Sequence, residues 1–339
     1  MNADGVGESD PTGVVGDTTG MPTTDGLRPG ATDKGTVPNT RRSGTPTTDG
    51  FRPGATDKGT VPNARRSAGE VVFVGAGPGA ADLITVRGAK VIAEADIIIW
   101  ASSLVDAALI ADARPDALIV DSASLSLEGV QPLYQRAKDE GLLVARVHTG
   151  DPSIYGATAE QRRLCDEIGL PHRTIPGVSA FAAAAARMDA EITVPEVSQS
   201  MILTRLEGGR TPMPERETVR GFAAHGATMA LYLSAARNKV LQEELLAGGY
   251  PPETPCIVGY RVTWPDELML RCRLDELSAA MAEHKLWKHT IVLVGPALAE
   301  TGIETRSHLY HPGFRHEYRK AEGEAPVPGP GTTHRKARP

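Results

Sequence analysis

The chain has 339 residues, a formal net charge of −6 and 23% charged residues. Its length predicts about two domains, and its acidic balance argues against nucleic-acid binding, which favours a basic excess. All apolar runs are much shorter than the ~20 residues of a membrane-spanning helix, and the N-terminus lacks a secretory signal pattern. The three cysteines have no metal-ligand or redox spacing. These features predict a cytoplasmic protein without a metal site and without nucleic-acid or membrane partners.

Residues 1–69 differ from the rest in composition. They hold 13 Gly and 7 Pro but only seven Val, Leu, Ile or Phe residues, too few to offset the conformational entropy of folding. Within them, a 24-residue segment at Pro22–Thr45 recurs at Pro46–Gly69 with four differences. Because the repeat lacks an apolar skeleton that could stack, we interpret residues 1–69 as a disordered tail. A docking segment that uses its arginine pairs is the alternative. Residues 320–339 are also predicted to be disordered.

From Glu70 onward, short apolar runs alternate with longer amphipathic segments. The apolar runs predict strands at Val71–Val74, Ile97–Trp100, Leu118–Val120, Leu143–Val147 and Arg173–Ile175. The amphipathic segments predict helices at Leu83–Ile92, Leu127–Glu140, Thr158–Ile168 and Ala180–Arg187. This alternation is typical of a parallel sheet with helices on its faces.

After about residue 195 the pattern changes, because several predicted strands follow one another without a helix between them. Strands are predicted at Met201–Thr204, Thr228–Leu233, Cys256–Tyr260, Leu268–Arg273 and Thr290–Val294, with helices at Lys239–Ala247 and Asp275–Glu283. Such an order favours a mixed sheet. We therefore predict two α/β domains, residues 70–192 and 193–319, with a small-molecule site in the cleft between them.

A glycine-rich turn, Val74–Gly79, follows the first predicted strand and would let a ligand approach the backbone closely. Gly75, Gly77 and Ala80 also match a loose dinucleotide-binding pattern, so an NAD-dependent oxidoreductase is an alternative. Two features disfavour it. Pro78 has no N–H to offer a pyrophosphate, and the acid expected ~20 residues later is missing. A tight strand-to-helix turn without a ligand is the other alternative.

Two more loops follow predicted strands, HTGDPSIYG at His148–Gly156 and PGVSA at Pro176–Ala180. Ligands bind at the carboxyl ends of strands in open α/β sheets. We expect the two strands to be neighbours, so that both loops face one crevice, and His148 to be a candidate for substrate contact. An Asp-Pro turn without a functional role is the alternative.

The stretches VVFVGAGPGAADLITVRGAK, HTGDPSIYGA and IPGVSAF together resemble the tetrapyrrole methylase superfamily. Four others are similar to its precorrin-4 C11-methyltransferase branch in the cobalamin pathway: WASSLVD (100–106), VDSASLSLE (120–128), EVSQSMILTRLEGGRTPMPE (196–215) and YRVTWPDE (260–267). The resemblance covers about residues 70–319. It implies two α/β domains of a non-Rossmann methyltransferase fold, S-adenosyl-L-methionine (SAM) as methyl donor, precorrin-4 as substrate and a homodimer.

The resemblance also implies which positions contact SAM. They are Pro78 in the GPG turn, residues of the GDP and PGVS loops, and two positions after strands of the second domain: Thr149, Gly150, Asp151, Ile154, Ser179, Ala180, Leu233 and Val262. Related uroporphyrinogen methylases have an acid after the second strand and a lysine after the third. These positions correspond to Ala101 and Ser122 here, which argues against that activity and leaves a catalytic base unassigned.

Precorrin-4 carries several carboxylates, which arginine side chains bind well. We therefore predict as substrate contacts Ser102, Ser103, Arg205, Arg210 and Arg261, although each arginine alone could be an ordinary surface residue. The activity implied is SAM-dependent methylation of C11 in precorrin-4. Alternatives are a cobalt-precorrin-4 enzyme, another precorrin or uroporphyrinogen C-methyltransferase, the NAD-dependent oxidoreductase, and a non-catalytic interaction protein.

Overall fold

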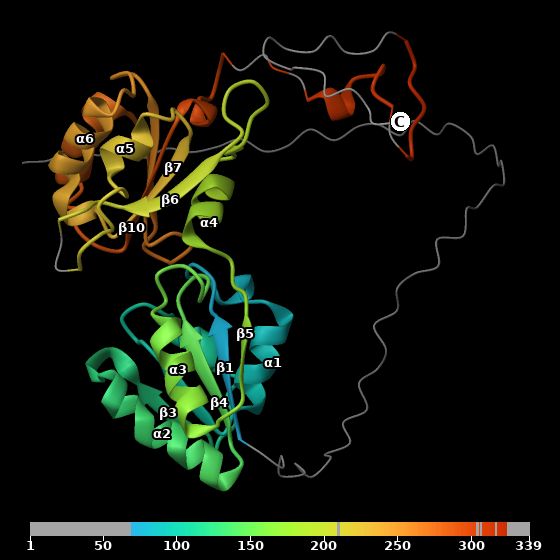
Figure 1. Cartoon of the computed structure of the whole chain (residues 1–339), viewed down its shortest axis with the longest axis vertical. Helices are drawn as coiled ribbons and strands as arrows, with labels where there is room; N and C mark the ends of the chain where they lie inside the picture. Colours follow the sequence, from blue (N-terminus) through green and yellow to red (C-terminus); the bar gives the residue numbers. More distant parts are fainter. Residues whose placement is uncertain (1–68, 209–210, 303–304, 306, 316, 324–339) are drawn as a thin grey trace, which may run out of the picture. The chain divides into compact units, whose positions relative to one another are not determined.

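The computed structural model describes residues 69–208, 211–302, 305, 307–315 and 317–323. These residues form two five-stranded sheets with helices packed on them, which confirms the predicted α/β class (Figure 1). The two predicted tails lie outside the described residues except for Gly69 and residues 320–323.

The first sheet is fully parallel, as predicted, with the strand order β3-β2-β4-β1-β5. Its strands are β1 (Glu70–Gly75), β2 (Ile97–Trp100), β3 (Leu118–Asp121), β4 (Leu143–His148) and β5 (His172–Ile175). The helices between them are α1 (Val86–Glu94), α2 (Leu127–Glu140) and α3 (Thr158–Ile168). One expectation was wrong: β4 and β5 are not neighbours, because β1 lies between them and pairs with both.

Both faces of this sheet are covered, and β1 shows why its sequence is continuously apolar. Val72 and Val74 pack in the cluster that contains α1 residues, whereas Val71 and Phe73 pack against α2 and α3. All four side chains are fully buried. Figure 1 shows α1 on one side of the sheet and α2 and α3 on the other. A strand that is buried on both faces needs apolar residues at every position.

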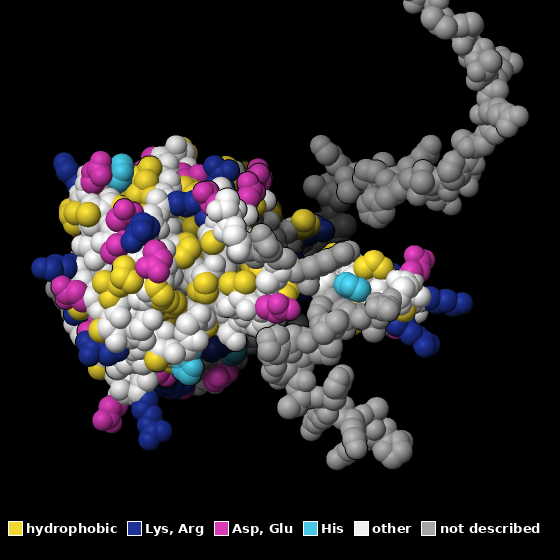
Figure 2. Space-filling view, turned by 90° about the horizontal axis from the view of Figure 1, so that it is seen from above, with side chains coloured by type: hydrophobic (Ala, Val, Ile, Leu, Met, Phe, Trp, Pro, Cys, Tyr) yellow, Lys and Arg dark blue, Asp and Glu magenta, His cyan; other side chains and the backbone are white. Residues whose placement is uncertain are grey.

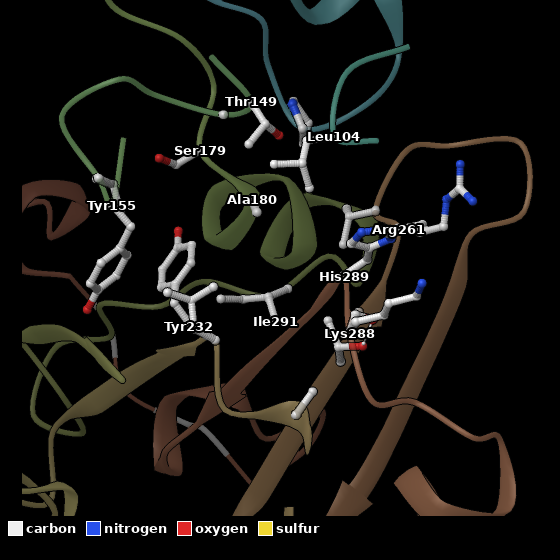
Figure 3. Close-up of a pocket in the computed structure, with 18 of the residues that line it drawn as sticks. Leu104, Thr149, Tyr155, Ser179, Ala180, Tyr232, Arg261, Lys288, His289 and Ile291 are labelled. Atoms are coloured by element: carbon white, nitrogen blue, oxygen red, sulfur yellow. Dashed lines mark hydrogen bonds between the residues drawn. The ribbon is translucent and has the colours of Figure 1, made fainter. Parts of the chain in front are cut away.

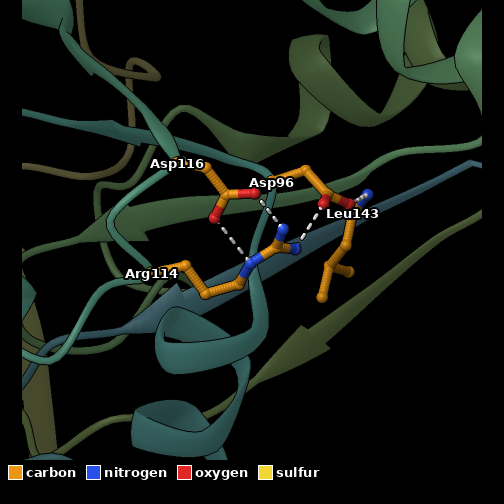
Figure 4. A network of polar contacts seen from close by, with 4 residues as sticks. All are labelled: Asp96, Arg114, Asp116 and Leu143. Carbon is orange, nitrogen blue, oxygen red and sulfur yellow. Dashed lines mark hydrogen bonds and ion pairs between the residues drawn. The ribbon is translucent and has the colours of Figure 1, made fainter. Parts of the chain in front are cut away.

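A polar network ties together the amino-terminal ends of β2, β3 and β4 (Figure 4). Asp96 Oδ1 accepts a hydrogen bond from Arg114 Nη1 at 2.6 Å, and Asp96 Oδ2 accepts one from the Leu143 amide at 2.8 Å. Arg114 also forms a two-pronged ion pair with Asp116. Every charged group in this network therefore has an oppositely charged partner.

The second sheet is mixed, which confirms the prediction. Its order is β6-β7-β10-β8-β9, and only β6 and β7 pair in parallel. The strands are β6 (Met201–Arg205), β7 (Thr228–Tyr232), β8 (Pro255–Tyr260), β9 (Leu268–Arg273) and β10 (Thr290–Val294). The predicted strand at residues 228–233 ends one residue early, because Leu233 has a φ of +52°.

Helices cover both faces of the second sheet as well. On one face lie α5 (Val219–Ala223), α6 (Asn238–Ala247) and α7 (Leu277–Glu283), around a core that includes Met229 and Leu231. On the other face lies α4 (Ala180–Arg187), whose alanines pack against Ile257 and Leu293. The domain boundary at residues 192/193 stays a prediction, and the packing of α4 on the second sheet favours an earlier one.

The visible surface mixes acidic and basic side chains, and neither sign dominates the face shown in Figure 2. Among the described residues, no helix has the length and apolar character to span a membrane.

Candidate functional site

Three loops at the carboxyl end of the first sheet are joined by backbone contacts, although their strands are not all adjacent. The Gly77 amide donates to the Gly150 carbonyl at 3.3 Å, and the Gly150 amide donates back to Gly77 at 2.7 Å. The Gly177 amide donates to Asp151 Oδ2 at 2.9 Å. The GPG, GDP and PGVS loops thus form one surface, with β1 in the centre.

Glycine is required where these loops meet. A Cβ atom on Gly177 would lie 2.1 Å from the Gly150 carbonyl oxygen, and one on Gly75 would lie 2.4 Å from the Gly177 nitrogen. Neighbouring backbone atoms cannot move aside as a flexible side chain can. The glycine pattern in the sequence therefore reflects close approach between loops.

Asp151 holds the GDP loop in shape. Its Oδ1 accepts hydrogen bonds from the Ser153 amide at 2.8 Å and the Ser153 hydroxyl at 2.5 Å. Partial burial acts to raise the pKa of Asp151, but the hydrogen bonds from Ser153 and Gly177 outweigh it and lower the pKa below its usual value. Asp151 is therefore a carboxylate at neutral pH.

The loop after β8 contacts the GPG turn and so joins the second sheet to the first. Trp264 Nε1 donates to the Pro78 carbonyl at 3.1 Å, and the Ala80 amide donates to Thr263 Oγ1 at 2.9 Å. A Cβ atom on Gly79 would lie 2.3 Å from the Trp264 ring. The stretch YRVTWPDE is therefore a contact between the two sheets as well as a wall of the site described next.

A cavity of about 440 Å³ opens between these loops and the carboxyl end of β7 (Figure 3). Its walls are mostly apolar and aromatic, with a few polar groups, as in typical small-molecule sites. All nine positions that were predicted to contact SAM line it: Pro78, Thr149, Gly150, Asp151, Ile154, Ser179, Ala180, Leu233 and Val262. Residues that are distant in sequence and come from both sheets are thus brought together.

Several lining residues were not predicted. They are mainly aromatic or basic: Tyr155, Tyr232, Trp264, Trp287, Lys288 and His289. Tyr155 and Trp264 belong to motifs already singled out, so motif membership could have found them. Residues 287–289 have no local signal beyond their position just before β10.

Backbone strain is concentrated around this cavity. Four lining residues other than glycine have a positive φ: Tyr155 (+54°), Leu233 (+52°), Arg261 (+44°) and His289 (+54°). Such conformations cost free energy, and they cluster at sites where the surrounding structure holds them for function.

The two ends of the cavity differ in character. At one end, Tyr155 and Tyr232 lie with ring centroids 5.4 Å apart. At the other end, Figure 3 shows Arg261, Lys288 and His289 gathered together. Burial, with help from the Lys288 and Arg261 charges, lowers the pKa of His289, so this imidazole is neutral at pH 7.

The predicted substrate contacts are only partly brought together. Ser103 and Arg261 line the cavity, and Arg261 also stacks on Trp264 at 4.2 Å and pairs with Asp266. Ser102 lies outside the lining and donates to Asp121 Oδ2 at 2.5 Å. Arg210 lies outside the described residues.

Arg205 ends β6 and does not line the cavity. Its Nη2 donates to the carbonyls of Thr211 and Pro212 at 2.9 and 3.1 Å. No carboxylate of the described residues pairs with it. Burial raises the pKa of Tyr155, and the charge of Arg205 opposes this rise, so Arg205 lies near the tyrosine end of the cavity.

The expectation for His148 was wrong, because its side chain faces the sheet core instead of the cavity. It is 8% exposed and its ring lies 5.9 Å from that of Phe73. Burial, with a smaller contribution from the Arg146 charge, lowers the pKa of His148 to about 3. No group of three metal-binding side chains occurs within the part of the chain that the structure describes.

Known proteins match most of this chain. Residues 70–278 match the family model of tetrapyrrole (corrin/porphyrin) methylases. A cobalt-precorrin-4 C(11)-methyltransferase of Methanocaldococcus jannaschii is 43% identical over 252 residues, covering 74% of this chain and 96% of that protein. A precorrin-4 C(11)-methyltransferase of Pseudomonas aeruginosa is also 43% identical, with coverages of 74% and 99%. The X-ray structure of a cobalt-precorrin-4 methyltransferase superposes with a TM-score of 0.66 at 41% identity, covering 68% and 96% of the two chains.

Proposed function

The chain belongs to the tetrapyrrole (corrin/porphyrin) methylase family, and we propose that it transfers a methyl group from SAM to C11 of precorrin-4, which gives precorrin-5 in cobalamin biosynthesis. The observation that carries this proposal is the near-complete match to C11-methyltransferases, at 43% identity over 96% and 99% of two relatives. A shared domain alone would leave the methylated carbon open, whereas a match of this length includes the second sheet and its loops.

The residues present suit SAM. The cavity volume of about 440 Å³ falls within the range of small-molecule sites. Gly150 has a φ of +61°, and Gly177 packs directly on the Gly150 carbonyl, so glycine at these positions keeps the GDP and PGVS loops in contact beside the cavity.

In this proposal the nine cavity-lining positions that the family resemblance implies hold SAM. Backbone groups of Thr149, Gly150 and Ala180 and the ionised Asp151 would bind the polar parts, and Leu233 and Val262 would contact the flat adenine ring. The position of all nine residues around one cavity supports these roles. Calorimetric titration should detect binding of S-adenosylhomocysteine (SAH) but not of NAD, and the reverse result would favour the oxidoreductase alternative.

When bound, SAM supplies an electrophilic methyl group on a sulfonium. The protein's own contribution is alignment, because holding donor and acceptor in line converts an encounter in solution into a reaction within one complex. The interlocked glycine loops give a rigid floor for this, and the contact between Trp264 and Pro78 fixes the opposite wall. No nucleophilic side chain is needed, and the catalytic base stays unassigned.

The substrate contacts remain proposals. Ser103 and Arg261 are supported by their position in the cavity wall, and Arg205 by its lack of a carboxylate partner among the described residues. We also propose that the enzyme is a cytoplasmic homodimer with two domains between residues 70 and 319, and that their boundary lies before α4, earlier than the predicted 192/193, because α4 packs on the second sheet.

A relative that acts on the cobalt form and one that acts on the metal-free form are equally similar to this chain. The direct test uses SAM with a ¹³C-labelled methyl group, with precorrin-4 and cobalt-precorrin-4 as substrates in parallel. NMR should locate the new methyl at C11, and the ratio of kcat/KM values should identify the preferred form. A methyl group at another carbon, or no transfer to either substrate, would overturn the proposal.

A further inference from the structure

Two of the three cysteines face each other across the second sheet. Cys256 of β8 and Cys272 of β9 are partners in the antiparallel register of these strands. Side chains of directly opposed residues lie on the same face of a sheet, and both cysteines pack with the core that α5, α6 and α7 cover. Both are free thiols. Their spacing in the sequence does not indicate this pairing, because the pairing depends on the register of two strands.

This register suits a disulfide bond between the two residues. Directly opposed residues in antiparallel strands have Cα atoms about 4.5 or 5.5 Å apart, and disulfides join residues whose Cα atoms lie about 4.4 to 6.8 Å apart. The thiols of Cys256 and Cys272 are within hydrogen-bonding reach of each other. A bond between them therefore fits the strands as they are.

The two thiols differ in access and in acidity. Cys256 is 1% exposed, whereas Cys272 is partly exposed on β9, the last strand in the order of the second sheet. The hydrogen bond between the thiols lowers the pKa of Cys272, against the effects of burial and of the acids Glu276 and Asp275. The thiolate is the form that attacks a disulfide, so Cys272 is the better first nucleophile. Burial raises the pKa of Cys165 to about 12, which makes that thiol unreactive.

We propose that Cys256 and Cys272 form a reversible oxidation site, at which a small-molecule disulfide of the glutathione type converts the two thiols into a bond between β8 and β9. The Cys272 thiolate attacks one sulfur of the small disulfide, forms a mixed disulfide and releases one thiolate. Cys256 then gives its proton to solvent, and its sulfur attacks the Cys272 sulfur and releases the second thiolate. Two protein thiols are thus oxidised to one disulfide, and one small disulfide is reduced to two thiols.

The bond ties the base of a hairpin that carries part of the cavity wall. The loop between β8 and β9 contains Val262 and Trp264, and Trp264 Nε1 donates to the Pro78 carbonyl. About 15 residues lie between the two cysteines, and closing a loop of this length restricts the unfolded chain. Oxidation should therefore stabilise the sheet that holds this wall.

The test treats the reduced full-length protein with glutathione disulfide and counts the free thiols after denaturation. The count should fall from three to one, and peptide mass spectrometry should find Cys256 joined to Cys272 within one chain. Dithiothreitol should restore all three thiols. Three remaining thiols, glutathione adducts without this bond, a bond to Cys165 or a bond between two chains would each overturn the proposal.

Single variants test the order of attack. In Cys256→Ser, one glutathione should stay bound to Cys272, because no second thiol can displace it. In Cys272→Ser, the buried Cys256 should take up no glutathione, and an adduct there would contradict Cys272 as the first nucleophile. Cys165→Ser is the matched control and should form the bond as the wild type does. Should a variant not fold, the peptide map of the wild-type protein still decides whether the bond forms.

Thermal unfolding tests the effect on stability. The oxidised wild-type protein should melt about 5 °C or more above the reduced protein, and Cys256→Ser should show no such rise after the same treatment. An unchanged or lower melting temperature of the oxidised protein would overturn the stabilising role. All of these readouts are made without SAM or precorrin-4, so their failure would leave the proposed function intact.

Discussion

The two ends of the first sheet differ in whether their polar and charged groups have partners within the protein. At the amino end, Asp96 and Arg114 are fully paired, and the Leu143 amide completes the network. At the carboxyl end, the backbone of Tyr155 is strained, and Arg205, which lies near Tyr155, has no carboxylate partner among the described residues. We call the amino end, where the charged groups are paired, the saturated end, and the carboxyl end with the cavity beside it the unsaturated end.

Within this one sheet, the amino end therefore contributes to stability and the carboxyl end to function. Local rules of backbone geometry and polar pairing are broken mainly at functional sites, where surrounding structure compensates for the cost. Here the amino-end network and the two-sided core are available to compensate for strained loops at the other end. Substitutions at the two ends should accordingly have different readouts, one in unfolding and one in ligand binding.

The largest effect is expected at Gly177, where the loops of the unsaturated end meet. In Gly177→Ala the new Cβ would overlap the Gly150 carbonyl and Gly75. The loops must separate, so we expect a loss of about 3 kcal/mol in the free energy of unfolding and no measurable SAH binding. Urea unfolding and calorimetry provide the two measurements.

Gly129→Ala is the matched control for this substitution. Gly129 lies in the first turn of α2, and its added Cβ would meet only the flexible Leu125 side chain, at 3.3 Å. The helix should gain up to about 1 kcal/mol, and SAH binding should be unchanged. Equal behaviour of the two variants would show that glycine is not needed for loop contact.

The next effect tests the saturated end. In Asp96→Ala, the Leu143 amide and Arg114 both lose a charged partner. We expect the free energy of unfolding to fall by about 2 kcal/mol, with SAH affinity within about twofold of the wild type. A marked loss of SAH affinity at unchanged stability would contradict the division between the two ends.

Much of this fold could be predicted from sequence because its local patterns agree with its packing. The segments β2, α2, α3, α4, β9 and β10 have the predicted bounds. The helix α5 was missed, because five residues are too few to show helical periodicity. The place of β1 between β4 and β5 was also missed, since strand order depends on tertiary packing and no local pattern encodes it.

The candidate site divides in a similar way. Glycine-rich loops that follow strands can be recognised from composition. With the family resemblance added, the residues of these loops could be predicted as site residues. Tyr232 could not, because an aromatic residue at a strand end is normally read as core. The basic residues 288 and 289 precede a strand and resemble any exposed loop. Only the three-dimensional arrangement shows that they line the same cavity as Pro78.

The smallest effect is expected at Arg205, the last residue of β6, which we assign to the unsaturated end. Its guanidinium is held by two carbonyl oxygens and has no carboxylate partner among the described residues, so it can still bind an anion from outside. Arg205→Ala should raise the KM for precorrin-4 about 10-fold, which corresponds to about 1.4 kcal/mol, and leave SAH affinity unchanged. Arg273→Ala is the control, because Arg273 already pairs with Asp275 at an exposed position. If steady-state kinetics give the same KM for both variants, Arg205 is an ordinary surface residue, and the unsaturated region ends at the cavity wall.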